Sequence, residues 1–330
     1  MTIPRRTFLL AAAGAAALPA VPRVARAQAY PTRPITVVVP FAPGGGTDIA
    51  ARIVGEQMAR TLGQQFVVQN IAGAGGTIGS TRAMRADPDG YTIVMGQLGT
   101  HAVAVPLYPN LAYRPDVDFD PIGLAAEFPL VIAARKDFPP KDLREFVAYV
   151  QANFSRLNMA HAGVGSTFFI GALLLNSILR VNPTLVPFNG GAPATNALVA
   201  GQVDYMCSDV LTSAPQLQAG LIKAYAIAAA ARSPVLPELP TTQEAGLPEF
   251  QVASWFGLFA PRATPKAILD KLTDALDQAL DDANARKRLA EIALDVPDKS
   301  RRGQTALLAL VKSEIERWTP IIKAANVKID

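Results

Sequence analysis

The stretch Ile35-Thr-Val-Val-Val-Pro-Phe-Ala-Pro-Gly-Gly-Gly-Thr-Asp48 decides the fold of this chain. Its first five residues are all β-branched, which is typical of a strand buried in a parallel sheet. Two prolines and three glycines end the strand, and Thr47 and Asp48 are good N-cap residues for a following helix. Such a joint brings main-chain N–H groups and the positive end of a helix dipole to one point. The stretch therefore predicts an α/β fold and a main-chain site for a small anion.

Three further glycine joints follow the same plan, each leading from a strand-like run into a helix-like run. They are Gly73-Ala-Gly-Gly-Thr-Ile-Gly79, Ala162-Gly-Val-Gly-Ser-Thr167 and Phe188-Asn-Gly-Gly-Ala192. A single joint of this kind is also explained by packing alone, because every helix start needs partners for its first N–H groups. Four joints, two in each half of the chain, favour a ligand cleft lined by loops at the carboxyl ends of strands.

Strand-like runs alternate with helix-like runs through most of the chain, which predicts a parallel α/β architecture. The expected strands are 35–39, 66–68, 92–95, 130–133, 157–160, 185–188, 203–207, 224–228 and 252–259. The expected helices are 48–62, 78–86, 141–153, 166–179, 192–200 and 266–281, with a further helical pattern over 307–322 that Pro320 kinks or breaks. About 300 mature residues exceed what one hydrophobic core usually serves, so two domains are expected.

The first 27 residues are typical of a cleaved secretory leader, which we exclude from the fold. Arg5-Arg6 precedes an apolar, alanine-rich stretch, and Ala25-Arg-Ala27 forms an A-x-A-like cleavage site. The apolar stretch is far shorter than the ~20 residues that a membrane span needs. The paired arginines resemble a twin-arginine leader, although Pro4 stands where Ser or Thr is more common, so twin-arginine and general secretion both stay open. We expect a periplasmic protein that is cleaved near Ala27.

The charge balance of the mature chain gives no reason to expect nucleic acid or an anionic membrane as a partner. The full chain has 31 Lys and Arg against 27 Asp and Glu, but four of the arginines lie in the leader, which holds no acid. The mature protein therefore has 27 bases and 27 acids and is close to neutral. Cys207 is the only cysteine, and its apolar surroundings predict a buried, unreactive thiol.

The chain carries no recognised catalytic, metal or cofactor motif. It has neither a P-loop nor a G-x-G-x-x-G followed by a suitably placed acid. With two histidines, one cysteine and no H-E-x-x-H, neither a metal site nor a cofactor is expected. Ser166 does not lie in a G-x-S-x-G elbow, so we predict that the protein is not an enzyme. Asp209, directly after an expected strand, either binds an amino or hydroxyl group of a ligand or caps the next helix, and both interpretations stay open.

Seven motifs occur in the order found in a known family. They are Pro40-Phe-Ala-Pro-Gly-Gly-Gly-Thr-Asp48, Gly73-Ala-Gly-Gly-Thr-Ile-Gly79, Gly99-Thr-His101, Val186-Pro-Phe-Asn-Gly-Gly-Ala-Pro193, Gly201-Gln-Val-Asp204, Leu239-Pro-Thr-Thr-Gln-Glu-Ala-Gly246 and Trp255-Phe-Gly-Leu-Phe-Ala-Pro261. In these motifs the chain resembles the extracytoplasmic solute receptors of tripartite tricarboxylate transporters, also called the Bug family. The resemblance covers nearly the whole mature chain.

The resemblance implies a type II-like periplasmic-binding-protein fold with two α/β lobes, a two-crossover hinge and a ligand cleft between the lobes. We assign residues 28–128 and 256–330 to lobe 1 and residues 129–255 to lobe 2, with the hinge near 127–129 and 253–256. It also implies a small carboxylate as ligand, the membrane permease subunits of a tripartite tricarboxylate transporter as partner, and a monomeric receptor.

The family's ligand-binding positions can be carried over to matching residues of this chain. These are Phe41, Pro43, Gly46, Thr47, Asp48, Gly75, Gly76, Thr77, Thr100, His101, Ser166, Thr167 and Asp209. The chain departs from the family at Phe168 and Phe169, where many members have a polar residue and a histidine, and we add both to the predicted site. An apolar wall there favours a carboxylate with an aromatic or aliphatic body over a citrate-like ligand.

The predicted function is therefore capture of a small carboxylate in the periplasm and its delivery to a tripartite tricarboxylate-type transporter. The alternative is a receptor of the same fold that presents its ligand state to a sensor protein. An exported hydrolase on this fold is a third interpretation, which would require turnover that depends on Ser166.

Overall fold

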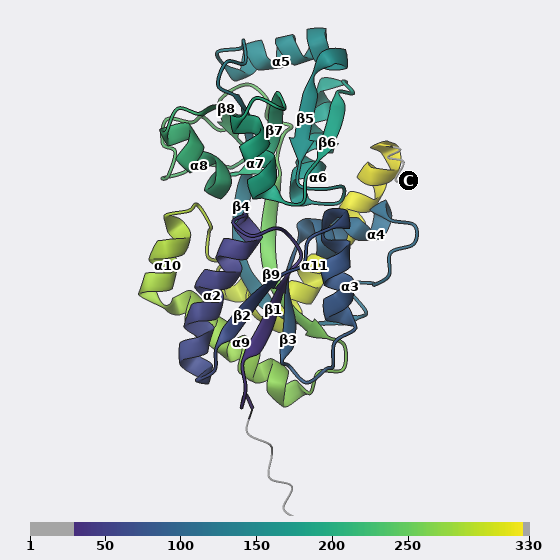
Figure 1. Cartoon of the computed structure of the whole chain (residues 1–330), viewed down its shortest axis with the longest axis vertical. Coiled ribbons are helices and arrows are strands. Elements are labelled where there is room, and N and C mark those ends of the chain that lie inside the picture. The colour runs from purple at the N-terminus through teal and green to yellow at the C-terminus, as the bar shows by residue number, and fades with distance from the viewer. Residues whose placement is uncertain (1–29, 326–330) are drawn as a thin grey trace, which may run out of the picture.

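The computed structural model describes residues 30–325, so the predicted leader and its cleavage site lie outside the described residues. The chain forms two α/β lobes, which lie one above the other in Figure 1. Lobe 1, the lower one, contains both the first and the last described elements, and lobe 2 contains the middle of the chain. Among the described helices, none is long and apolar enough to cross a membrane.

Lobe 1 is built on a sheet that begins with the strand predicted first, β1 (Ile35–Val39). β1 lies between β2 (Phe66–Asn70) and β3 (Thr92–Gln97) and runs parallel to both. β3 then pairs with β9 (Ala253–Pro261) in the antiparallel direction, and β9 pairs with the first part of β4 (Phe119–Arg135). The carboxyl ends of β1 and β3 therefore lie at the same edge of the sheet, toward lobe 2.

Lobe 2 is built on the second part of β4, which pairs with β7 (Tyr205–Asp209) and β8 (Ile222–Ile227). β7 is followed in the sheet by β5 (Asn158–His161) and β6 (Thr184–Pro187). β4 changes partners at one point: Pro129 is opposite Ala253 of β9, and Leu130 is opposite Asp209 of β7. β4 and β9 are thus the two strands that cross between the lobes, side by side in Figure 1.

Helices cover both lobes. Lobe 1 has α2 (Gly46–Leu62), α3 (Thr77–Met84), α4 (Ala104–Leu107), α9 (Lys266–Asp281), α10 (Ala283–Ala290) and α11 (Gly303–Ala325). Lobe 2 has α5 (Leu143–Asn153), α6 (Thr167–Leu179), α7 (Gly191–Val199) and α8 (Val210–Gln218). Single turns occur at η1 (Ala74–Gly76), η2 (Gly99–Val103), η3 (Phe154–Arg156) and η4 (Lys299–Arg301). The amphipathic stripe of α9 is buried against α2 and β4, as its spacing predicts.

Four features differ from the sequence prediction. The sheet is mixed, because both crossing strands run antiparallel to their neighbours, whereas the alternation of elements predicted a parallel sheet. The first part of β4 was missed because Pro121 and Pro129 interrupt its pattern; Pro121 lies at a register shift, where a strand tolerates proline. α11 continues through Pro320 instead of breaking there. α10 was also missed, because its charged sequence shows no clear apolar stripe.

Candidate functional site

Four helices begin at one small cavity in the seam between the lobes. α2 belongs to lobe 1, and α6, α7 and α8 belong to lobe 2 (Figure 1). The first residue of α2, α6 and α7 and the N-cap of α8 line the cavity. The cavity has a volume of about 20 Å³ and is lined by Phe41, Gly45, Gly46, Thr47, Gln97, Phe128, Ala162, Ser166, Thr167, Phe168, Gly191, Asp209 and Phe256. A helix N-terminus carries unpaired N–H groups and partial positive charge, so their convergence makes the cavity suited to an anion.

The N-terminus of α2 is open on the cavity side. Its N-cap residue is Gly45, which has no side chain to accept hydrogen bonds from the first amides of the helix. Gly46 and Thr47, which carry the first helical amides, line the cavity. A Cβ atom at position 46 would lie 2.7 Å from Oδ2 of Asp209 and 3.3 Å from the Phe256 ring. Glycine at this position therefore allows main chain and the facing lobe to approach each other closely.

Asp48 does not line the cavity, but it holds the first glycine joint in place. Its buried carboxylate accepts hydrogen bonds from the Gly44 amide at 3.0 Å, from Arg52 at 2.9 Å and from the Asn70 side-chain amide at 3.0 Å. Burial alone would raise the pKa of Asp48, but the hydrogen bonds from Arg52, Gly44 and Asn70 lower it overall. Asn70 also donates to the carbonyl oxygen of Phe41 at 3.0 Å, so the end of β2 is tied to the loop after β1.

The N-terminus of α6 supplies hydroxyl groups as well as amides. Ser166 is the N-cap, and its hydroxyl oxygen accepts a hydrogen bond from the Phe169 amide at 3.2 Å. Thr167 forms a short hydrogen bond to Oε1 of Gln97 in lobe 1 and a 3.0 Å contact with the Ser254 hydroxyl at the start of β9. The buried side chains of Gln97, Thr167 and Ser254 therefore link the two lobes and one crossing strand around the cavity.

Asp209 is both a helix cap and a cavity residue. Oδ1 accepts hydrogen bonds from the Thr212 amide at 2.7 Å and the Thr212 hydroxyl at 2.6 Å, which caps α8. Both of the hydrogen bonds that the described residues give to this carboxyl group end on Oδ1, whereas Oδ2 lies beside Gly46. Burial raises the pKa of Asp209, and the hydrogen bonds from Thr212 only partly oppose this. The two interpretations of Asp209 left open by the sequence are therefore compatible.

The rest of the cavity wall is aromatic. Phe41 lies in the first glycine joint, and Phe168 directly follows the third, Ala162–Thr167. Phe128 and Phe256 come from the two crossing strands. The rings of Phe128 and Phe256 stack with their centroids 4.5 Å apart. The site therefore combines main-chain donors, hydroxyl groups and one carboxyl group with an apolar wall, a combination suited to a small carboxylate with a hydrocarbon body.

The second glycine joint lies at the rim of the seam and not at the cavity. A Cβ atom on Gly75 would lie 1.6 Å from the carbonyl oxygen of Val164 in lobe 2, so only glycine allows this approach. The Tyr108 hydroxyl of lobe 1 donates to the same Val164 oxygen at 2.5 Å. Nearby, the Ala42 amide donates to the Asn189 carbonyl oxygen at 2.9 Å, a main-chain hydrogen bond between the lobes.

The structure brings part of the predicted site to the cavity. The predicted residues that line it are Phe41, Gly46, Thr47, Ser166, Thr167, Phe168 and Asp209. The predicted residues that lie elsewhere are Pro43, Asp48, Gly75, Gly76, Thr77, Thr100, His101 and Phe169. His101 is in the core of lobe 1, stacked on Phe259 at 4.2 Å, and burial lowers its pKa to about 3. Phe169 packs on His161 at 4.9 Å, so Phe168 is the phenylalanine that faces the cavity.

Several cavity residues were not among the predicted site residues: Gly45, Gln97, Phe128, Ala162, Gly191 and Phe256. Gly45 and Gly191 belong to glycine joints that the sequence analysis had singled out. Gln97 ends β3, and its position at the carboxyl end of a parallel strand could have marked it. Phe128 and Phe256 lie in the predicted hinge segments 127–129 and 253–256, but they were not predicted to line the cavity.

Two other chemistries find no support in the described residues. No group of three or more His, Cys, Asp and Glu side chains is placed to hold a metal ion among residues 30–325. Cys207 is fully buried in β7, and burial raises the pKa of its thiol.

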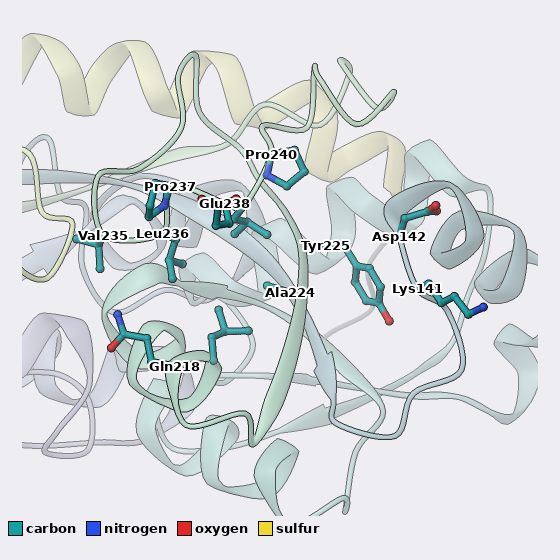
Figure 2. Close-up of a pocket in the computed structure, with 12 residues that line it drawn as sticks. Lys141, Asp142, Gln218, Ala224, Tyr225, Val235, Leu236, Pro237, Glu238 and Pro240 are labelled. Carbon is teal, nitrogen blue, oxygen red and sulfur yellow. The ribbon is translucent and has the colours of Figure 1, made fainter.

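A separate hollow of about 610 Å³ lies on lobe 2, between β8, α8 and residues 235–240 (Figure 2). Figure 2 shows Lys141 and Asp142 at one end of this hollow, which contains none of the predicted site residues.

Comparison with known proteins identifies the family. Residues 50–327 match the model of the tripartite tricarboxylate transporter family receptor. The structure of MatC from Rhodopseudomonas palustris with bound malate is 52% identical, with a TM-score of 0.86 over 89% of this chain and 100% of that protein. The periplasmic binding protein BugD is 41% identical, with a TM-score of 0.87 over 91% of this chain and 99% of that protein.

A third solved structure, that of R. palustris Rpa4515 with adipate, is 32% identical, with a TM-score of 0.85 over 90% of this chain and 98% of that protein. The family model and these relatives each cover most of the chain, and the two-lobe fold agrees with them. The chain therefore belongs to the receptors of tripartite tricarboxylate transporters, in the Bug family of periplasmic solute-binding proteins, and is not an enzyme.

Proposed function

We propose that this receptor captures a small aliphatic dicarboxylate in the seam between its lobes and delivers it to the membrane components of a tripartite tricarboxylate transporter. The observation that carries this proposal is the convergence of four helix N-termini on one cavity, with Gly45 leaving the first amides of α2 uncapped. The malate complex of MatC and the adipate complex of Rpa4515 support the choice of an aliphatic dicarboxylate.

Main-chain donors supply a large part of the binding energy. A hydrogen bond to a charged group contributes about 1.5–3 kcal/mol. Micromolar affinity corresponds to about 8 kcal/mol, after the entropy lost on association has been subtracted. Three or four amides from the N-termini of α2 and α6, together with the Ser166 hydroxyl, therefore hold one carboxylate group, with no arginine among the described residues that line the cavity.

Asp209 gives the site a preference for a hydroxyl group on the ligand. A second carboxylate next to Asp209 would be repelled, whereas a ligand hydroxyl would donate to Oδ2, which lies beside Gly46 in the cavity. Malate has such a hydroxyl group on the carbon next to one carboxylate. We therefore place a 2-hydroxy dicarboxylate of this kind first among the candidate ligands.

Binding requires the lobes to part. A cavity of about 20 Å³ holds about one water molecule and not a four-carbon acid. We propose that residues 28–128 and 256–330 move against residues 129–255 about the two crossing strands, near the point where β4 leaves β9 after Pro129 and pairs with β7. In such a hinge motion only a few residues change their backbone angles. When the lobes close on the ligand, the glycine joints of lobe 1 contact those of lobe 2 as they do in this structure.

A thermal-shift and calorimetry screen tests the proposal. The mature protein, unfolded and refolded to remove any acid carried through purification, is titrated with malate, succinate, adipate, citrate and benzoate. A ligand at 100 times its dissociation constant stabilises by about 2.7 kcal/mol, which raises the melting temperature by about 5 °C. We expect malate to give the largest shift and citrate to give none. A shift with no dicarboxylate, or the largest shift with citrate, would contradict the proposal.

A further inference from the structure

The outer side of α3 presents an unusual combination of side chains to solvent. Ile78, Arg82 and Arg85 follow one another at helical spacing on the side of α3 that faces away from the sheet, and all three are exposed. Ile78 is 53% exposed, which places it among the few large apolar side chains that the described residues leave in contact with water. We call these three residues, together with Thr77 and Thr81, the α3 face.

The α3 face is hollowed and continuous with the loop after α4. One hollow of about 560 Å³ is lined by Thr77, Ile78, Thr81, Arg82 and Arg85. A second hollow of about 290 Å³ is lined by Thr77, Thr81 and residues 108–112. Because both hollows share two threonines, they form one groove along the flank of lobe 1, where α3 and α4 lie in Figure 1.

The charge of this groove is not compensated within the described chain. Arg82 and Arg85 form no ion pair with any described residue. The nearby acid Asp89 is paired with Arg33 at 3.0 Å, and Asp87 forms no ion pair with either arginine. Two unpaired guanidinium groups beside an exposed isoleucine are complementary to a segment that carries carboxylates and an apolar side chain.

The groove also reaches the seam between the lobes. Tyr108, which lines its inner end, donates its hydroxyl to the Val164 carbonyl oxygen of lobe 2 at 2.5 Å and lies 3.3 Å from the Ala74 carbonyl oxygen of lobe 1. Parting of the lobes breaks the first contact and releases one wall of the groove. A partner seated on the α3 face would therefore bind the closed receptor more tightly than the open one.

We propose that the α3 face docks an acidic, partly apolar periplasmic segment of the transporter's membrane subunits and favours the closed, loaded receptor. This inference rests on the proposed function for the identity of the partner and for the closure of the lobes on the ligand. A protein segment fits the surface better than a lipid membrane does, because two cations in a formed groove fall short of the clusters of about 4–8 Lys and Arg that recognise anionic lipids.

Binding to purified membrane subunits tests the proposal. The membrane subunits of the cognate tripartite tricarboxylate transporter are held in nanodiscs of neutral lipid, and binding of the mature receptor is measured with and without malate. Arg82→Glu/Arg85→Glu is expected to weaken this binding at least tenfold, and Ile78→Ser about threefold. The matched control, Arg144→Glu/Arg286→Glu, makes the same charge change at two exposed arginines on α5 and α10 that form no ion pair with a described residue, and is expected to bind like the wild type.

Two further measurements separate the outcomes. Malate affinity, measured by calorimetry, is expected to be the same in all variants. If the wild type does not bind malate, the proposed ligand is contradicted, but the docking test is not affected. Binding of the wild type to bare phosphatidylglycerol vesicles, if lost in Arg82→Glu/Arg85→Glu, would overturn the proposal in favour of a lipid surface. Equal binding of both double variants to the subunits would also overturn it.

Discussion

At the scale of single residues, Asp48 and Asp209 show how one residue type serves two purposes. Both carboxyl groups are buried at the start of a helix, but their pKa values move in opposite directions. Burial alone would raise the pKa of both carboxyl groups. Asp48 accepts hydrogen bonds from Arg52, the Gly44 amide and the Asn70 side-chain amide, so its pKa falls. Among the described residues Thr212 is the only hydrogen-bond donor to Asp209, and the pKa of Asp209 rises.

Asp48→Asn should destabilise the protein in a pH-dependent way. Because the pKa of Asp48 is lowered on folding, its contribution is present above the ordinary value of 3.8 and is lost as the pH falls through the lowered value. At pH 7 we expect a loss of about 1.5–3 kcal/mol, which is the usual contribution of hydrogen bonds to a charged group. Chemical denaturation of both proteins at pH 7 and pH 3 measures the difference, which should shrink at the lower pH. A constant difference would contradict this account.

Asp209→Asn should have the opposite effect on stability. The raised pKa of Asp209 means that its charged form costs stability above that value, so removal of the charge should keep or raise the melting temperature at pH 7. Asparagine still caps α8. Malate affinity should fall about tenfold or more through loss of the acceptor for the ligand hydroxyl, whereas affinity for succinate, which lacks the hydroxyl, should not fall. Equal losses for the two acids in calorimetry would count against this role.

The residue scale also shows what the sequence could predict of the site. Residues at the glycine joints, such as Gly46 and Thr167, reach the cavity because a strand–glycine–helix joint fixes where the first amides of a helix lie. Phe128 and Phe256 fall in the predicted hinge, but their contact with the cavity could not be predicted, because strand alternation does not tell which face of a crossing strand meets the other lobe. Gly75 was predicted to bind the ligand for the same reason as Gly46; its joint meets main chain of the opposite lobe, and its role in binding stays a prediction.

At the scale of elements, the helix caps both stabilise the lobes and aim amides at the cavity. Ser166→Ala removes the cap of α6, and Asp142→Ala removes the equivalent cap of α5, whose carboxylate accepts from the Glu145 amide at 2.8 Å. Each change should cost about 1 kcal/mol of stability. Only Ser166→Ala should also weaken malate binding, because only α6 begins at the cavity. Similar malate affinities for both variants would show that the Ser166 side chain plays no part in binding.

Elements were predicted well where the pattern is local and poorly where tertiary contacts decide. β1 and α9 have the predicted bounds, because a β-branched run and an amphipathic stripe each point to one structure. β4 is longer than predicted, because two crossing strands support each other through prolines that would end an isolated strand. α11 passes Pro320 near its end, where the residues before it are anchored by the buried Trp318.

At the scale of the whole molecule, closure of the lobes depends on glycine at the seam. Gly75 and Gly63 both have positive φ, at 62° and 68°, but a Cβ on Gly63 meets no atom within 4 Å, whereas one on Gly75 meets Val164. Gly75→Ala and Gly63→Ala should therefore cost similar stability through backbone strain. Only Gly75→Ala should keep the lobes apart, with a larger radius of gyration in small-angle scattering at saturating malate. Matching scattering curves for the two variants would contradict this.

A crystal structure of the mature receptor with malate tests the central claim most directly, since that claim concerns where a carboxylate is held. We predict that one malate carboxylate lies within hydrogen-bond distance of the Gly46 or Thr47 amide and of the α6 N-terminus, with the malate hydroxyl on Asp209. Malate bound outside the seam, for example in the hollow of lobe 2 beside Tyr225, would contradict the account.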